Sequence, residues 1–125
     1  METKIDELTI EGVVYVPKDQ VTELAPSCKG LPYKIVRTYS AGVFVGYLKS
    51  LNGKHAIMHS ARRVWYWEGA NSLSDLATIG TTKPSNCKIT ASVEIVELTE
   101  AIEILSVTTD AMKSIAGVPV WTQKK

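Results

Sequence analysis

Alternating apolar and polar positions in the middle of the chain predict a run of β-strands. The alternation, together with β-branched and aromatic residues, predicts strands at 33–39, 43–48, 56–58 and 63–67. Two glycine-containing turns, 40–42 and 51–53, separate the first three strands. Gly46 lies inside the second strand, where a glycine predicts the close approach of another chain segment. Short connections of this kind favour antiparallel pairing.

Two segments in the second half of the chain carry signals for the start and end of a helix. Residues 72–79, SLSDLATI, begin with a serine that can cap a helix and are followed by Gly80. Residues 110–116 follow Thr108 and Thr109, either of which can act as the N-cap. We therefore expect two short helices.

Acidic and apolar residues alternate in the segment between these helices. Residues 93–98 and 102–107 predict two strands joined by a turn at 99–100, and a helix over 97–105 is an alternative that the pattern leaves open. A further short strand is expected at 88–90. Together the segments predict an α+β fold, with an antiparallel β-sheet (a meander of about five to seven strands) and two short helices.

The N-terminal part of the chain is predicted to form an arm. Residues 8–16, LTIEGVVYV, have the pattern of a small β-hairpin, and residues 18–32 contain prolines and glycine with little periodicity. A β-hairpin is only marginally stable alone, so this one is expected to dock on its own domain or on another subunit. The sequence thus divides into a hairpin and linker arm, 1–32, and a single α+β domain, 33–125.

Length and composition are those of one folded domain. The 125 residues are 45% apolar and 22% charged, and the net charge is +1, which disfavours bulk disorder and a duplex-DNA coat protein. No apolar run approaches the ~20 residues that cross a bilayer. The acidic N-terminus, METKIDEL, is unlike a signal peptide. Cys28 and Cys87 lack metal-ligand spacing and are expected to be incidental thiols of a cytosolic protein, although a single bridge between them stays open.

Charge is distributed unevenly along this nearly neutral chain. Residues 25–67 contain seven basic residues, both histidines and no acid, whereas 1–24 and 68–107 each contain six acids and two bases. Seven of the nine aromatic residues also lie in the basic segment. A basic, aromatic segment suits an anionic, planar ligand such as a nucleotide. The alternative is that neighbouring strands neutralise one another across the sheet.

Two clusters of the basic segment are the candidate ligand-binding residues. Arginine pairs with phosphate through two hydrogen bonds, and tryptophan stacks on planar groups; by strand alternation Arg63, Trp65 and Trp67 share one face. The other cluster, RTYSAG at 37–42, offers an arginine, hydroxyl groups and a small-residue turn. The predicted site therefore comprises Arg37, Tyr39, Ser40, Arg62, Arg63, Trp65 and Trp67. The alternative is that the aromatic residues fill the core and Arg62 pairs with acids of 94–103.

The sequence carries no catalytic signature. His55 and His59 are four residues apart, but in a strand that spacing separates them by ~13 Å. No nucleophile motif, phosphate-binding loop or metal-binding motif accompanies them. We therefore expect a protein that is not an enzyme, with no catalytic residues, no metal site and no cofactor.

Three segments carry a resemblance to known proteins: RTYSAGVFVG at 37–46, ARRVWYWEGANSLSDLA at 61–77 and LTEAIEI at 98–104. They resemble a widespread family of small bacteriophage and prophage proteins of unknown function. The segment LTIEGVVYVP at 8–17 also resembles an N-terminal appendage of some members. Members often have His where this chain has Phe44, so a polar role is not carried over to that position.

The basic segment is also similar in composition to viral nucleotide sponges, such as the Thoeris anti-defence sponges. Proteins of that class sequester cyclic ADP-ribose or cyclic oligonucleotide signals of immune systems without cleaving them. The resemblance implies a phage accessory protein of the host cytoplasm that binds a small anionic nucleotide, commonly in a pocket between subunits of a homo-oligomer. A virion-associated structural or oligomer-forming protein is the alternative; a membrane partner is not expected, and nucleic acid ranks third.

Overall fold

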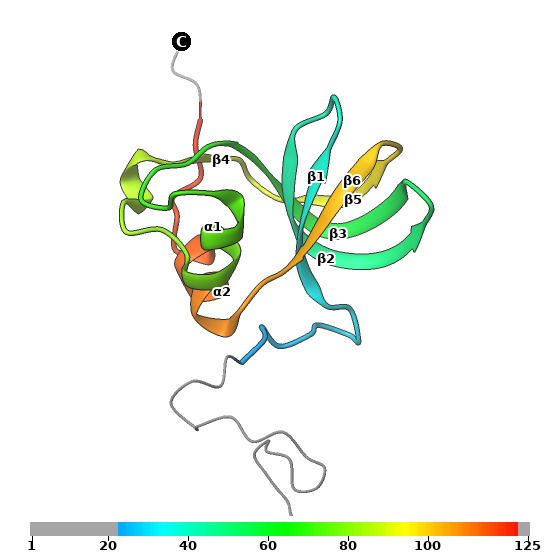
Figure 1. The fold of residues 1–125 in the computed structure, drawn as a ribbon, viewed down its shortest axis with the longest axis horizontal. Coiled ribbons are helices and arrows are strands. Elements are labelled where there is room, and N and C mark those ends of the chain that lie inside the picture. The colour runs from blue at the N-terminus through cyan, green and yellow to red at the C-terminus, as the bar shows by residue number, and fades with distance from the viewer. Residues whose placement is uncertain (1–22, 123–125) are drawn as a thin grey trace, which may run out of the picture.

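The protein is described here by a computed structural model covering residues 23–122, in which one curved antiparallel sheet carries two helices on one side (Figure 1). In chain order the elements are β1 (Tyr33–Thr38), β2 (Val43–Asn52), β3 (His55–Tyr66), α1 (Leu73–Ile79), the 3₁₀ helix η2 (Pro84–Asn86), β4 (Lys88–Ile89), β5 (Val93–Leu98), β6 (Ala101–Ser106) and α2 (Thr109–Ala116). The predicted α+β fold class is confirmed. No helix in the described part of the chain is long and apolar enough to span a membrane.

Five of the strands curl into a partly closed barrel. The paired strands follow the order β5-β3-β2-β1-β6, and the two end strands are consecutive in the chain, so a short turn joins the ends of the row. The core inside the curl takes a side chain from each of the five strands: Val36, Phe44, Met58, Leu98 and Ala101. The sheet therefore curls around its own apolar side chains.

A second core lies between the outer side of the sheet and the helices. Ile35, Val45 and Val64 contribute from the strands, and Leu76 and Ile115 contribute from α1 and α2. Because both sides of β1 are covered, its adjacent residues Ile35 and Val36 are both fully buried, one in each core.

Both predicted helix caps are present. The Ser72 hydroxyl accepts a hydrogen bond from the N–H of Asp75, and the Thr108 hydroxyl accepts one from the N–H of Ala111. The Thr108 hydroxyl also donates to the Thr78 carbonyl at 2.7 Å, which joins the start of α2 to α1. Thr108, rather than Thr109, is thus the cap of the second helix.

Two strand predictions are wrong in extent. The separate strands at 56–58 and 63–67 are one strand, the 12-residue β3, which pairs first with β5 and then with β4. β2 continues to Asn52 and β3 begins at His55, so the turn is 53–54 rather than the predicted 51–53. The alternative helix over 97–105 is also wrong, because β5 and β6 occupy that segment.

A bulge allows β3 to remain continuous through its middle. Val45 pairs with Arg62 and Tyr47 with His59, so β3 holds one more residue than β2 between these pairs. Ser60 lies there with a left-handed φ of 51°. A Cβ on Gly46 would lie 2.7 Å from the Cα of Ala61, which confirms the predicted close approach at that glycine.

The chain before β1 packs against the domain over its described length. The N–H of Ala25 donates to the Val107 carbonyl, and the N–H of Leu48 in β2 donates to the Pro32 carbonyl. Between these contacts, Cys28 and Leu31 exchange two backbone hydrogen bonds and form a tight turn. The predicted hairpin at 8–16 lies outside the described residues.

Candidate ligand-binding site

Arg62 is a structural link between three parts of the chain. Its Nε donates to the Thr90 carbonyl at 2.7 Å, Nη1 donates to Ile115 at 3.1 Å, and Nη2 donates to Ile89 and Val118 at 3.2 and 3.1 Å. Burial lowers the pKa of its guanidinium. The side chain thus ties β3 to β4 and to the end of α2, and it pairs with carbonyl groups rather than with the acids of 94–103.

Arg63 points to the opposite side of the sheet. Its guanidinium carbon lies 4.7 Å from the ring centroid of Phe44 and 5.7 Å from that of Trp65. Its Nε is buried and has no hydrogen-bond partner, while Trp65 is 59% exposed. The predicted shared face is therefore present for Arg63 and Trp65, but not for Trp67, which follows the end of β3 and packs against the helix-side core.

The predicted turn cluster is neutralised by acids of β6 and of the turn that precedes it. Arg37 Nε pairs with Glu103 Oε1 at 2.8 Å, and the Ser40 hydroxyl donates to the Glu100 carboxylate. The N–H of Tyr39 donates to the Glu100 carbonyl, and its side chain is 79% exposed. Strand-to-strand neutralisation, the alternative considered above, therefore describes the surroundings of Arg37.

The seven predicted residues do not line one cavity. Arg62 and Arg63 point to opposite sides because they are consecutive in a strand, and Arg37 has its own carboxylate partner. None of the seven lines the hollow described next.

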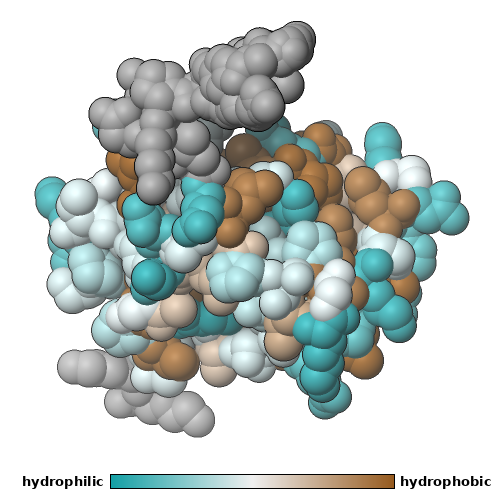
Figure 2. Space-filling view, turned by 90° about the horizontal axis from the view of Figure 1, so that it is seen from below, coloured by the Kyte–Doolittle hydropathy of each residue, from teal (hydrophilic) through white to brown (hydrophobic). Residues whose placement is uncertain are grey.

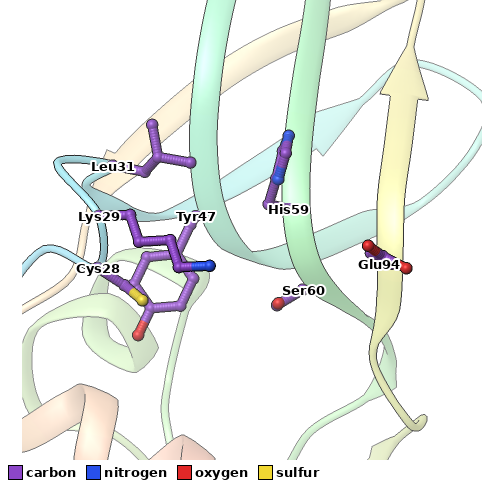
Figure 3. Close-up of a pocket in the computed structure, with 7 residues that line it drawn as sticks. All are labelled: Cys28, Lys29, Leu31, Tyr47, His59, Ser60 and Glu94. Carbon is purple, nitrogen blue, oxygen red and sulfur yellow. The ribbon is translucent and has the colours of Figure 1, made fainter.

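A polar hollow opens where the turn at 28–31 faces β2, β3 and β5 (Figure 3). Its volume is about 470 Å³ including the part open to solvent. Seven residues line this Tyr47 hollow: Cys28, Lys29, Leu31, Tyr47, His59, Ser60 and Glu94. The side chain of Lys29 enters from the turn, Glu94 lies on the opposite side, and His59 and Ser60 lie between them.

Two strained backbone positions shape the Tyr47 hollow. Lys29 and Ser60 have φ values of 53° and 51°, and they are the non-glycine residues with left-handed φ within residues 23–122. Such a conformation costs about 1–2 kcal/mol for an L-residue and persists where the surrounding structure fixes it. Here the turn fixes Lys29 and the bulge fixes Ser60. Strain of this kind clusters at functional sites, so its convergence favours the Tyr47 hollow as the candidate site.

The tyrosines beside the hollow stay protonated near neutral pH. Burial raises the pKa of Tyr33 to about 12, and the electrostatic interaction with Tyr47 also raises this pKa. Burial, with a smaller contribution from the Cys28 thiol, also raises the pKa of Tyr47. The two rings pack edge to face with centroids 5.1 Å apart. Tyr47 therefore offers the hollow a neutral hydroxyl that can donate or accept a hydrogen bond.

The two cysteines are free and differ in exposure. Cys28 is exposed at the rim of the Tyr47 hollow, whereas Cys87 is buried. The bridge that the sequence left open is not formed. Cys28 and His59 both line the hollow. Within residues 23–122, no cluster of three histidine, cysteine or acidic residues could hold a metal ion.

Sequence reasoning missed the residues of this hollow, although all of them except Glu94 lie in the basic segment that it identified. Lys29, Tyr47 and His59 all belong to the basic segment. Single residues that lie far apart in sequence are weaker indicators of a binding site than two adjacent arginines. The available signals were Gly30, which marks the turn, and Gly46, which marks the close approach of β3.

The fold and the geometry define an α+β domain with a partly closed barrel and a polar hollow on its outer side. The chain belongs to the family described as a domain of unknown function, DUF6948, whose model matches residues 31–115. No match was found among curated proteins or among solved structures. The expectation of a family of unknown function is confirmed.

Proposed function

We propose that the protein binds a small anionic molecule of the nucleotide class in the Tyr47 hollow and does not turn it over. The observation that carries the proposal is the convergence of Lys29, His59 and Ser60 on one hollow. An ammonium group, an imidazole and a hydroxyl are the side chains that bind phosphate oxygens.

The biological role that we propose follows the resemblance to small phage proteins. As a phage accessory protein of the sponge class, the protein would hold a host immune signal in the host cytoplasm and keep it from its receptor. Binding without turnover follows the expectation from the sequence, in which no nucleophile motif or metal-binding motif accompanies the histidines. The segments 37–46 and 61–77 carry the resemblance to phage proteins.

The proposal predicts that ligand binding protects Cys28. With AMP or ADP-ribose as probes, the reaction of Cys28 with a thiol reagent should slow, and heat denaturation should return the nucleotide unchanged. Lys29→Met should weaken binding about tenfold or more, since it removes a charge-assisted hydrogen bond. Lys49→Met is the matched control, because Lys49 is exposed and does not line the hollow.

Each result of that experiment has a definite meaning. A chemically altered nucleotide would make the protein an enzyme. Equal loss of binding in the Lys29 and Lys49 variants would show that binding depends on the overall positive charge of the protein and not on a specific contact of Lys29. Failure of a broad panel of nucleotides to bind or to protect Cys28 would remove the proposed function.

A second candidate function, as an oligomer-forming or virion-associated protein, is favoured by the surface of β5. Val93 and Ile95 are 53% and 54% exposed, and within the described residues β5 pairs only with β3. Figure 2 shows hydrophobic residues gathered on the strand half of the face seen from below. Exposed apolar residues beside a free strand edge are typical of an association surface.

This candidate predicts a self-association that depends on β5. The double variant Val93→Thr and Ile95→Thr should shift the protein from oligomer to monomer in sedimentation or light scattering. Ile79→Thr is the matched control, since Ile79 is 63% exposed but lies on α1. A wild-type protein that is monomeric at high concentration would contradict this candidate.

A further inference from the structure

The Tyr47 hollow carries opposite charges on its two sides. Lys29 extends from the turn at 28–31, and Glu94 lies across the hollow on β5, with His59 and Ser60 between them (Figure 3). Among the described residues the ion pairs are Arg37–Glu103 and His55–Glu97, so Lys29 and Glu94 do not neutralise each other.

Backbone hydrogen bonds fix the points from which the two charged side chains extend. Lys29 belongs to a turn that is closed by two hydrogen bonds between Cys28 and Leu31. Glu94 lies between two register pairs of the β3–β5 ladder, His59–Ile95 and Ala61–Val93. Neither backbone position can move far without breaking hydrogen bonds, so the two side chains extend from opposite sides of the hollow.

A ligand that fits such a hollow must satisfy both sides. A phosphate group can bind the Lys29 ammonium and the Ser60 hydroxyl. Glu94 would repel a second phosphate, but its carboxylate can accept hydrogen bonds from the vicinal hydroxyls of a ribose. A simple inorganic anion gains from the first side alone and is repelled by the second.

We propose that the Tyr47 hollow selects ribose phosphates over simple anions, with Lys29 as the phosphate-binding residue and Glu94 as the residue that recognises the ribose hydroxyls. The inference rests on the proposed function, because it specifies the ligand class of the same hollow. Glu94 is thereby the specificity-determining residue.

Isothermal titration of the full chain with four probes tests the proposal: inorganic phosphate, ribose 5-phosphate, AMP and 2′-deoxy-AMP. AMP and ribose 5-phosphate should bind about tenfold or more tightly than phosphate, and loss of the 2′-hydroxyl should weaken binding several-fold. Glu94→Gln should remove most of this preference while phosphate binds as tightly as before or more tightly, because the repulsion is gone.

Glu97→Gln is the matched control, since Glu97 lies on the same strand and pairs with His55 outside the hollow. It should leave the preference for AMP unchanged. Phosphate binding as tight as AMP binding, or a preference that survives in Glu94→Gln, would overturn this inference and leave the proposed function standing. Failure of the wild-type protein to bind AMP and ribose 5-phosphate would overturn this inference, and failure of the broad nucleotide panel as well would overturn both.

Discussion

Replacing Arg62 with methionine is expected to lower the free energy of unfolding by about 3 kcal/mol, the cost of several hydrogen bonds from a charged donor. Its guanidinium serves four carbonyl groups in two segments that are distant from β3 in sequence. Methionine keeps much of the volume but leaves those carbonyls without their donor. Lysine should recover only part of the loss, because one ammonium group cannot reproduce the planar fork.

Urea denaturation of the variant measures this effect. Arg37→Met is the matched control, since Arg37 makes an exposed ion pair with Glu103 that is worth roughly 0–1 kcal/mol. A similar loss in both variants would contradict the structural role of Arg62. If a folded Arg62→Met protein still binds nucleotide, Arg62 is not part of the ligand-binding site, contrary to the prediction from the sequence.

Gly46→Ala is expected to destabilise the domain by about 2–3 kcal/mol, the cost of forcing an atom into a packed interior. The added Cβ would lie 2.7 Å from the Cα of Ala61 and 3.0 Å from the carbonyl oxygen of Ser60, and both are backbone atoms that cannot rotate away. To accept it, β2 and β3 must separate at the bulge. Because Ser60 and Tyr47 line the Tyr47 hollow on either side of this contact, the substitution should also weaken AMP binding.

Gly117→Ala is the matched control for this experiment. Gly117 has a right-handed φ of −80°, and an added Cβ would make ordinary contacts at 3.4 and 3.5 Å. Its effect on the free energy of unfolding should stay within about 0.5 kcal/mol. Thermal and urea denaturation compare the two variants, and equal stability would show that β2 and β3 tolerate a wider separation.

The secondary structure followed from local signals, and these were sufficient for most elements. Ser72 and Thr108 cap the helices through their own side chains, within three residues of the groups they bind. Alternation identified β1, β5 and β6. The continuity of β3 was not predictable in this way, because it depends on a bulge at Ser60 that exists only when β2 is paired.

The candidate site was harder to predict because its residues meet only after folding. The turn with Lys29, the bulge with Ser60 and the strand with Glu94 are far apart in sequence, and none carries a motif. Arg62 misled the sequence reasoning for a related reason: its partners are backbone carbonyls, which every residue possesses. Local charge therefore drew attention to the segment that contains Lys29 and Ser60, but not to these side chains or to Glu94, which lies outside it.

The pairing of β1 with β6 has a consequence for how the protein is made. Lys34 pairs with Ser106 and Val36 with Ile104. During synthesis, β1 therefore cannot complete its pairing until β6, one of the last elements of the chain, has left the ribosome. Before that point one edge of β1 is unpaired and its apolar side chains are incompletely buried. Chaperones and proteases recognise such features. A chain that ended before Ala101 would lack β6, and the edge of β1 that pairs with it would stay open to other strands.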